Sequence, residues 1–381
     1  MKCSGRCALS GASVEIEFGE TVTAVREIPD ISGCNWLSPG FIDLQVNGFA
    51  GVDYNDPVTP ADEIRRSIQA LYATGVTRFY PTVITGPPAD MEAALRNLAQ
   101  ARESVEGGDA IDGFHVEGPH ISAEDGPRGA HPRQWVRRPD YDEFRRWQDA
   151  AAGRLRIVTL APEWPEAPRY IERITADGVV AAIGHTAASA AQIADAVAAG
   201  ATLSTHLGNG AHQVLRRHPN YIWEQLAEDR LMADFIVDGI HLDASFLKTA
   251  IRAKTVQRAV LVTDASAPAG TAPGTYRLGE QKVELTAEGR VVLAGTDRLA
   301  GSALRMDRGV ENLVRLAGVT LSEAVEMATV NAARAGKVPG RTQGIAVGER
   351  ADFVQFGFDG TRAEVTGTWV SGRNVFGVET R

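Results

Sequence analysis

The segment from residue 179 to residue 212 constrains the fold most strongly, because it has the pattern of a strand–helix–strand unit. A short apolar run, Val179–Ile183, is followed by Gly184 and His185; an alanine-rich amphipathic segment, Ser189–Ala199, comes next, and a second apolar run ends at His206. This alternation predicts two parallel strands joined by a helix. The C-terminal ends of neighbouring parallel strands meet at one face, so we expect the two histidines to converge. Converging imidazoles favour a metal site over two unrelated polar residues on loops.

The same alternation continues through the middle of the chain. Further apolar runs with the length and composition of buried strands occur at 39–48, 77–83, 110–117, 155–161, 232–238 and 259–264. Together with the first two strands they give the strand count of a (β/α)8 barrel. We expect helices near 60–74, 306–316 and 321–328, and a hairpin over 275–295 that interrupts the pattern.

Both ends of the chain have a different pattern. Residues 1–38 and 351–376 alternate apolar and polar residues in short stretches, which predicts antiparallel strands. We therefore predict an α/β protein with a TIM-like (β/α)8 barrel over 39–341. A small β-sandwich domain would form from both termini, residues 1–38 and 342–381. A chain of 381 residues is long enough for both parts.

Composition limits the possible partners. The formal net charge is −9 and no long basic run is present, so we expect no nucleic-acid binding, and an anionic substrate would need a local basic patch. The cysteines Cys3, Cys7 and Cys34 do not make a disulfide framework, and we assign them no function. The N-terminal MKCSGRCALSG has no apolar core of signal-peptide length, and no apolar run is long enough to span a bilayer. We expect a soluble, cytoplasmic protein with no membrane partner.

Polar residues stand at the C-terminal ends of the predicted strands, where barrels of this class carry their active sites. They are Gln45, Asn47, His115, Glu117, His185, His206, His241 and Asp264. Glu117, His185 and His206 supply one carboxylate and two imidazoles, the ligand set of a catalytic zinc-type site with a position open for water. A salt bridge inside the barrel is the alternative for Glu117. Asp264 would accept and return a proton beside such a site, and a turn-capping aspartate is its alternative.

Several motifs match a known family and cover nearly the whole chain in order. They are PGFIDLQVNG from Pro39, HVEGP from His115, GAHP from Gly129, GHT from Gly184, THL from Thr205, DGIH from Asp238, LVTDA from Leu261, AVEMATVNAA from Ala324, and the segment 344–352. On these motifs the chain resembles the amidohydrolase superfamily and, within it, the N-acetylglucosamine-6-phosphate deacetylase family. The resemblance implies hydrolysis of the N-acetyl group of N-acetylglucosamine 6-phosphate to glucosamine 6-phosphate and acetate.

The resemblance also implies roles for individual residues. It assigns Glu117, His185 and His206 to the metal, Asp264 to general acid and base catalysis, and His131 to polarisation of the substrate carbonyl.

The resemblance further implies an amino sugar phosphate as substrate and a homodimer. It places His241 against the sugar or its phosphate, and it has Arg217 reach the phosphate across the dimer interface. The glycine-rich loop from Leu207 to His212 offers backbone N–H groups that could cradle an anion, so Asn209 and Gly210 are also assigned to substrate binding, together with Gln45. Without the resemblance, the basic run 216–218 would be taken as a solvated face.

One divalent metal ion per subunit is expected. Gln45 and Asn47 stand where many relatives carry a His-x-His metal pair, and amides hold divalent cations poorly. Zinc is the favoured ion, and iron, manganese, cobalt and nickel also suit the remaining ligands.

The chain departs from the family pattern in one loop. The family has His-Leu-aromatic-Asn-Ala-Met, whereas this chain has HLGNGAH from His206 to His212. The walls of the substrate pocket are therefore expected to differ, and another N-acyl amino sugar, an N-acyl amine or a cyclic amide is the alternative substrate. A non-catalytic binding protein on the same scaffold is a third hypothesis. The presence of Glu117, His185, His206 and Asp264 argues against it.

Overall fold

The centre of the fold is a parallel sheet that curves into a barrel. The computed structural model describes residues 1–30, 33 and 35–377. The strands of this sheet, in chain order, are β5 (Phe41–Val46), β8 (Val76–Ile84), β9 (Phe114–Glu117), β10 (Leu155–Leu160), β11 (Val180–Ile183), β12 (Leu203–Ser204), β13 (Met232–Ile236) and β14 (Ala259–Val262). Each strand pairs with the next one in the chain, and the backbone N–H of Asn47 donates to the carbonyl of Ala265 at 2.7 Å, which closes β5 onto β14. The predicted (β/α)8 barrel is confirmed, and each of its strands lies within or beside a predicted run.

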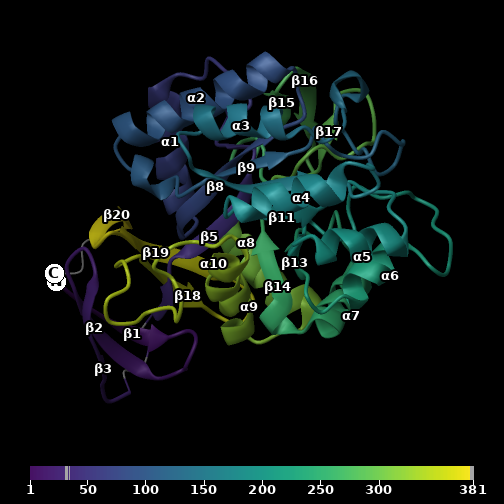
Figure 1. Cartoon of the computed structure of the whole chain (residues 1–381). Coiled ribbons are helices and arrows are strands. Elements are labelled where there is room, and N and C mark those ends of the chain that lie inside the picture. Colours follow the sequence, from purple (N-terminus) through teal and green to yellow (C-terminus); the bar gives the residue numbers. More distant parts are fainter. Residues whose placement is uncertain (31–32, 34, 378–381) are drawn as a thin grey trace.

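Helices surround the barrel on the outside (Figure 1). They are α1 (Ala61–Tyr72), α2 (Pro88–Ser104), α3 (Tyr141–Ala150), α4 (Ala167–Ala176), α5 (Ala190–Ala198), α6 (Tyr221–Ala227), α7 (Ala244–Lys254), α8 (Met306–Asn312) and α9 (Leu321–Ala328). The helix predicted over Ser189–Ala199 is α5, and Ser189 and Gln192 close its N-terminus with a capping box, which satisfies two otherwise unpaired N–H groups. The helix predicted over 306–316 is α8 followed by a π-helical turn, Leu313–Ala317. Within the described residues, no helix combines the length and apolar character needed to cross a bilayer.

The N-terminal end of the barrel is closed by apolar packing. Helix α10 (Val330–Ala335) places Ala332 and Ala333 against Ile42, Leu44 and other interior side chains of the strands. The hydroxyl of Tyr80 also donates to the carbonyl of Gly336 at 2.8 Å. Because this end is filled, a site can open only at the C-terminal ends of the strands.

Strands from both termini form the second sheet (Figure 1). It contains β1 (Lys2–Cys7), β2 (Ser13–Phe18), β3 (Val22–Glu27), β4 (Trp36–Pro39), β18 (Phe353–Phe358), β19 (Ala363–Val370) and β20 (Arg373–Gly377), in the order β20-β19-β18-β4-β1-β2-β3. The rings of Phe18 and Phe353 lie 4.8 Å apart although β1 and β4 separate their strands, so the sheet curls and encloses a core of its own. The predicted small β domain from both termini is confirmed.

The domain limits, 39–341 for the barrel and the remainder for the β domain, stay a prediction.

Cys3 is buried and Cys7 is half-buried, both as free thiols, while Cys34 lies outside the described residues.

A small antiparallel sheet interrupts the barrel after β14. It consists of β15 (Gly274–Leu278), β16 (Gln281–Leu285) and β17 (Val291–Leu293), so it has one strand more than the predicted hairpin. The third strand forms because a turn closed by Thr286 N–H and the carbonyl of Arg290, at 2.9 Å, returns the chain alongside β16. A two-stranded segment of the first loop, β6 (Gly48–Phe49) with β7 (Val52–Asp53), was not predicted.

A buried ion pair connects the barrel to the terminal sheet. Arg78 on β8 is 2% exposed, and its Nε donates to Asp352 Oδ2 at 2.6 Å while its Nη1 donates to the carbonyl of Pro339 at 2.6 Å. Burial alone would raise the pKa of Asp352, but the charges of Arg350, Arg78 and Arg341 hold it below its ordinary value. The carboxylate therefore stays ionised and depends on its arginine partners.

We predict that Arg78→Met lowers the free energy of unfolding by about 3 kcal/mol, because it leaves a buried carboxylate with fewer partners. The control is Arg138→Met, which removes an exposed ion pair with Glu166. This change should alter the free energy of unfolding by less than about 0.5 kcal/mol. Urea denaturation of the two variants beside the wild type measures both effects. Equal urea midpoints for Arg78→Met and the wild type would contradict the stabilising role of the Arg78–Asp352 ion pair.

Candidate active site and metal-binding cluster

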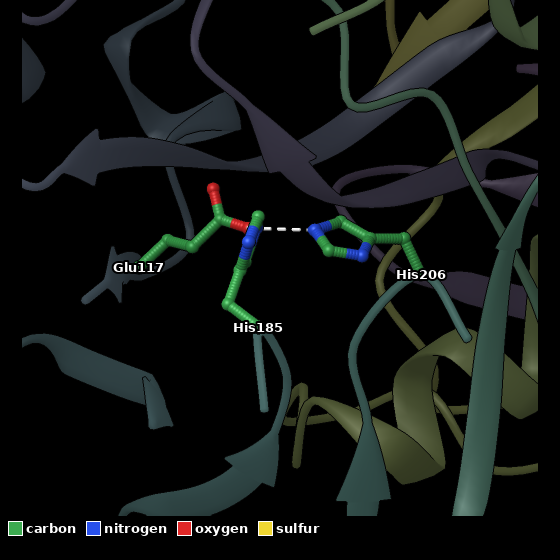
Figure 2. Close-up of side chains that lie close together, drawn as sticks. All are labelled: Glu117, His185 and His206. Atoms are coloured by element: carbon green, nitrogen blue, oxygen red, sulfur yellow. Dashed lines mark hydrogen bonds and ion pairs between the residues drawn. The ribbon is translucent and has the colours of Figure 1, made fainter. Parts of the chain in front are cut away.

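Three buried side chains meet at the C-terminal end of the barrel. Glu117 ends β9, His185 follows β11 and His206 follows β12. Glu117 Oε1 lies 2.7 Å from His206 Nε2 and 3.2 Å from His185 Nε2 (Figure 2). One ligand atom from each residue lies within 4.8 Å of the others, so the cluster could hold a metal ion. The predicted convergence of the two histidines is confirmed by this geometry.

Hydrogen bonds orient the two imidazoles. His185 Nδ1 lies 2.8 Å from the carbonyl of Pro127, which can only accept, so Nδ1 carries a proton and Nε2 is the nitrogen turned towards Glu117. The backbone N–H of His206 donates to the buried carboxylate of Asp234. The backbone φ angles are +49° at His185 and +29° at His206. Non-glycine residues rarely adopt this region, and such strain is concentrated at functional sites.

The charges within the cluster stabilise one another. Burial raises the pKa of Glu117, but hydrogen bonds and positive charge from His185 and His206 bring it well below its ordinary value. Burial lowers the pKa of His206, but the hydrogen bond and charge of Glu117 outweigh it and raise the pKa to about 9. His206 Nδ1 has no hydrogen-bond partner among the described residues. An ionised carboxylate with two imidazole nitrogens turned towards it is a donor set that fits a divalent cation.

Asp264 lies beside this cluster, directly after β14. Its Oδ1 accepts hydrogen bonds from Asn47 Nδ2 at 2.7 Å and from Gln45 Nε2 at 3.1 Å. Burial and the charge of Glu117 raise the pKa of Asp264 to about 6. With Oδ1 held by two amides, Oδ2 is the oxygen left to exchange a proton.

His131 approaches the cluster from the loop after β9. Its Nε2 lies 3.3 Å from His185 Nε2, and its Nδ1 lies 2.8 Å from the hydroxyl of Thr85. Burial and the charge of His185 lower the pKa of His131 to about 3, so the ring is neutral near pH 7 and carries a single N–H.

A cavity of about 890 Å³ opens above these residues. Its walls include the predicted residues Glu117, His131, His185, His206, Asn209, Gly210, His241 and Asp264. Gly210 has φ +54°, and a Cβ there would stand 2.5 Å from His185 Nδ1, so only glycine lets the loop lie against the Glu117–His185–His206 cluster. His241 is held in the wall by its Nδ1, 2.6 Å from Asp238 Oδ2.

Two predicted substrate-binding residues lie away from the cavity surface. Gln45 is 1% exposed and sits behind Asp264, to which it donates its hydrogen bond. Arg217 is exposed on the loop after His212 and is not among the residues that line the cavity of its own subunit.

Sequence reasoning missed the contribution of the inserted sheet. Gln281 Nε2 donates to the carbonyl of Ala130 at 2.7 Å, and Arg298 Nη1 donates to the carbonyl of Gly129 at 3.2 Å. These bonds hold the loop that carries His131. No spacing or periodicity in the sequence relates residues 281 and 298 to residues 129 and 130, because their contact depends on how the insertion folds back.

Comparison with known proteins agrees with this geometry. The amidohydrolase family profile matches residues 36–375. The chain belongs to the amidohydrolase family. It is 34% identical to the N-acetylglucosamine-6-phosphate deacetylase of Bacillus subtilis, over 84% of this chain and 80% of that protein. It is 35% identical to the enzyme of the same name from Bos taurus, over 95% of this chain and 88% of that protein.

A solved structure gives the same result. The Mycobacterium smegmatis N-acetyl-D-glucosamine-6-phosphate deacetylase, an aspartate-to-alanine mutant in complex with N-acetyl-D-glucosamine 6-phosphate, superposes with a TM-score of 0.88 and 32% identity. The match covers 98% of this amidohydrolase and 99% of the other chain. The family resemblance read from the motifs is confirmed.

We predict that His185→Gln reduces the metal content of the purified protein from about one ion per chain to near zero, because it removes a ligand nitrogen. The control is His212→Gln, which replaces a cavity histidine that lies outside the Glu117 cluster and should leave the metal content unchanged. Elemental analysis by mass spectrometry measures both variants. Full metal content in His185→Gln would rule out this ligand.

We also predict that metal binding releases a proton. With its pKa raised to about 9, His206 is protonated at pH 7 in protein stripped of metal, and it must lose that proton to bind an ion. The apparent affinity should therefore rise about tenfold per pH unit and level off above pH 9. Calorimetric titration of zinc in buffers of different ionisation enthalpy counts the protons, and a heat that does not depend on the buffer would contradict the assignment.

Proposed function

We propose that this amidohydrolase is a metal-dependent deacetylase that converts N-acetylglucosamine 6-phosphate into glucosamine 6-phosphate and acetate. The observation that carries the proposal is the placement of Asp264 and His131 around the Glu117–His185–His206 cluster in one cavity. The names of the relatives and the extent of the match support this substrate.

In this proposal Glu117, His185 and His206 hold one divalent ion, with zinc as the favoured metal. Such an ion supplies Lewis acidity, which makes water nucleophilic near neutral pH and polarises the amide carbonyl. The three residues fix its position from the ends of three different strands, and their burial keeps bulk water from competing with the substrate.

Asp264 acts as general base and then as general acid. Its Oδ2 takes a proton from the attacking water, and the same proton passes to the nitrogen as the C–N bond breaks, giving acetate and the free amine. The amides of Gln45 and Asn47 hold Oδ1 and so fix the direction of Oδ2. The pKa of about 6 suits a group that must gain and lose a proton near neutral pH.

The remaining residues position the substrate. The neutral ring of His131 donates its N–H to the carbonyl oxygen as negative charge develops there. Asn209, Gly210 and His241, which line the cavity, contact the sugar, and Gln45 contributes through its hydrogen bond to Asp264. We further propose that the protein is a cytoplasmic homodimer in which Arg217 of each subunit reaches the cavity of the other.

One observation supports a different acyl amino sugar as the second candidate. A Cβ at Gly208 would stand 2.8 Å from Leu242 Cδ2 and from the ring of Phe246, so the family aromatic has no room in this backbone position. Assays on a panel of N-acyl amino sugars, N-acyl amines and cyclic amides separate this candidate from the first.

The test is acetate release from N-acetylglucosamine 6-phosphate and from unphosphorylated N-acetylglucosamine by the metal-loaded protein. We expect rapid release from the phosphorylated sugar. Asp264→Asn should lower kcat by about 10²- to 10⁴-fold with unchanged metal content, because it removes the proton acceptor and keeps the shape. Asp149→Asn, an exposed change on α3, is the control and should match the wild type. Full activity in Asp264→Asn would disprove the proton-transfer role, and a metal-loaded wild type that releases no acetate from the phosphorylated sugar would refute the substrate.

A further inference from the structure

The loop that carries His131 is bound by side chains at several of its backbone carbonyls. The donors and acceptors are His185 Nδ1 to Pro127 at 2.8 Å, Arg128 Nη1 to His131 at 2.7 Å, Gln281 Nε2 to Ala130 at 2.7 Å and Arg298 Nη1 to Gly129 at 3.2 Å. Gln281 and Arg298 come from the insertion that contains β15, β16 and β17, and they lie 151 and 169 residues from their acceptors. The insertion therefore takes part in fixing the backbone beside the Glu117–His185–His206 cluster.

We propose that Gln281 is a positioning residue for catalysis, which binds the carbonyl of Ala130 and thereby fixes the His131 imidazole against this cluster. The inference rests on the proposed function, because it concerns the residue that would polarise the substrate carbonyl. It gives the inserted sheet a part in the chemical step, through His131 and without contact between Gln281 and the substrate.

The bond from Gln281 acts on the peptide unit that carries the His131 Cα. The carbonyl of Ala130 and the N–H of His131 belong to one planar group, so a bond to that carbonyl also fixes the direction in which the His131 Cα leaves the plane. The imidazole has Nδ1 2.8 Å from the hydroxyl of Thr85 and Nε2 3.3 Å from His185 Nε2. Rotation of the peptide unit would move both ring nitrogens away from these neighbours.

Further contacts make the inserted sheet a firm support for this bond. The N–H of Gly279, in the turn between β15 and β16, donates to the buried carboxylate of Asp53 at 2.6 Å. The side chain of Ala130 packs against the apolar core of the sheet. Beyond the loop, Trp135 Nε1 donates to Glu280 Oε2 at 2.9 Å. The side-chain amide that binds Ala130 therefore extends from a sheet that is itself attached to two other segments of the chain.

The test compares Gln281→Leu with the wild type in acetate release from N-acetylglucosamine 6-phosphate. Leucine has a similar size and no hydrogen-bond donor, so the carbonyl of Ala130 loses its partner. Gln281→Asn is the second variant, whose amide is one methylene shorter and whose side chain stays polar. The matched control is Lys282→Gln, an exposed change at the next residue of β16, which should match the wild type. Metal content and melting temperature are measured on every protein.

We expect Gln281→Leu to lower kcat about 10- to 100-fold at unchanged metal content, because a misplacement of roughly 1 Å in a catalytic group can cost that much. KM should stay within about threefold, since His131 acts on charge that develops only in the transition state. Gln281→Asn should show the same loss, and it carries the test if leucine prevents folding. Gln281 also lines the cavity, so a raised KM at wild-type kcat would indicate direct substrate contact and overturn the proposal, as would wild-type kinetics.

A double-mutant cycle with His131 separates positioning from a general loss of structure. In the His131→Gln background, Gln281→Leu should change kcat by less than about twofold, because its effect passes through a ring that is no longer there. The same fold-loss in both backgrounds would show that Gln281 acts elsewhere and would overturn the proposal.

Hydrogen–deuterium exchange of the metal-loaded proteins distinguishes a failure of this inference from a failure of the proposed function. The N–H groups of Gly129 and His131 donate to the carbonyls of Gly126 and Arg128 at 2.9 and 3.2 Å, so they are protected while the loop is held. If the wild type releases no acetate from the phosphorylated sugar, the proposed substrate fails, and exchange still tests the loop. Exchange over residues 127–135 that is about tenfold faster in Gln281→Leu, and unchanged in Lys282→Gln, supports the inference. Equal exchange in Gln281→Leu and the wild type overturns it.

Discussion

The buried carboxylate of Glu117 is the group on which the site depends. It is 3% exposed, and an ionised group at that depth is strongly unfavourable unless opposite charge and hydrogen bonds compensate. His185 and His206 supply that compensation. They follow β11 and β12, which lie two and three places away from β9 in the sheet. The register of these strands must therefore be held to within a fraction of an ångström. The same requirement explains why both histidines retain strained backbone angles.

A polar layer beneath the cluster provides that rigidity. His115, two residues before Glu117 on β9, places Nε2 2.7 Å from Thr159 Oγ1, and this hydroxyl lies 2.7 Å from Thr205 Oγ1. Burial lowers the pKa of His115 to about 4, so the network is uncharged near pH 7. On the other side of the barrel, Thr263 donates to the buried carboxylate of Asp43. Chains of satisfied hydrogen bonds between neighbouring strands fix their relative position, and below them the barrel is filled by apolar side chains.

The inserted sheet completes the cavity from the outside. It is attached to the barrel at several points, since Gly279 N–H donates to the buried carboxylate of Asp53 at 2.6 Å and Gln281 donates to Ala130. Burial raises the pKa of Asp53 to about 6, although the hydrogen bonds from Asn55 and Gly279 favour its ionised form. The insertion thus holds the His131 loop and presents charged residues to the rim.

The sequence by itself determined the barrel and predicted the residues of the candidate site. Each strand is a short apolar run, each helix is an amphipathic segment, and Glu117, His185, His206 and Asp264 follow directly from the rule that such barrels react at the C-terminal ends of their strands. These are local patterns, so a single chain is enough to recognise them. Only the tertiary structure decided which loops reach the cavity. It placed Gln45 behind Asp264, turned Arg217 outward and brought Arg290 and Arg298 to the rim. These outcomes depend on hydrogen bonds between segments far apart in the chain, such as the bond between Gln281 and Ala130, which leave no periodic signal in the sequence.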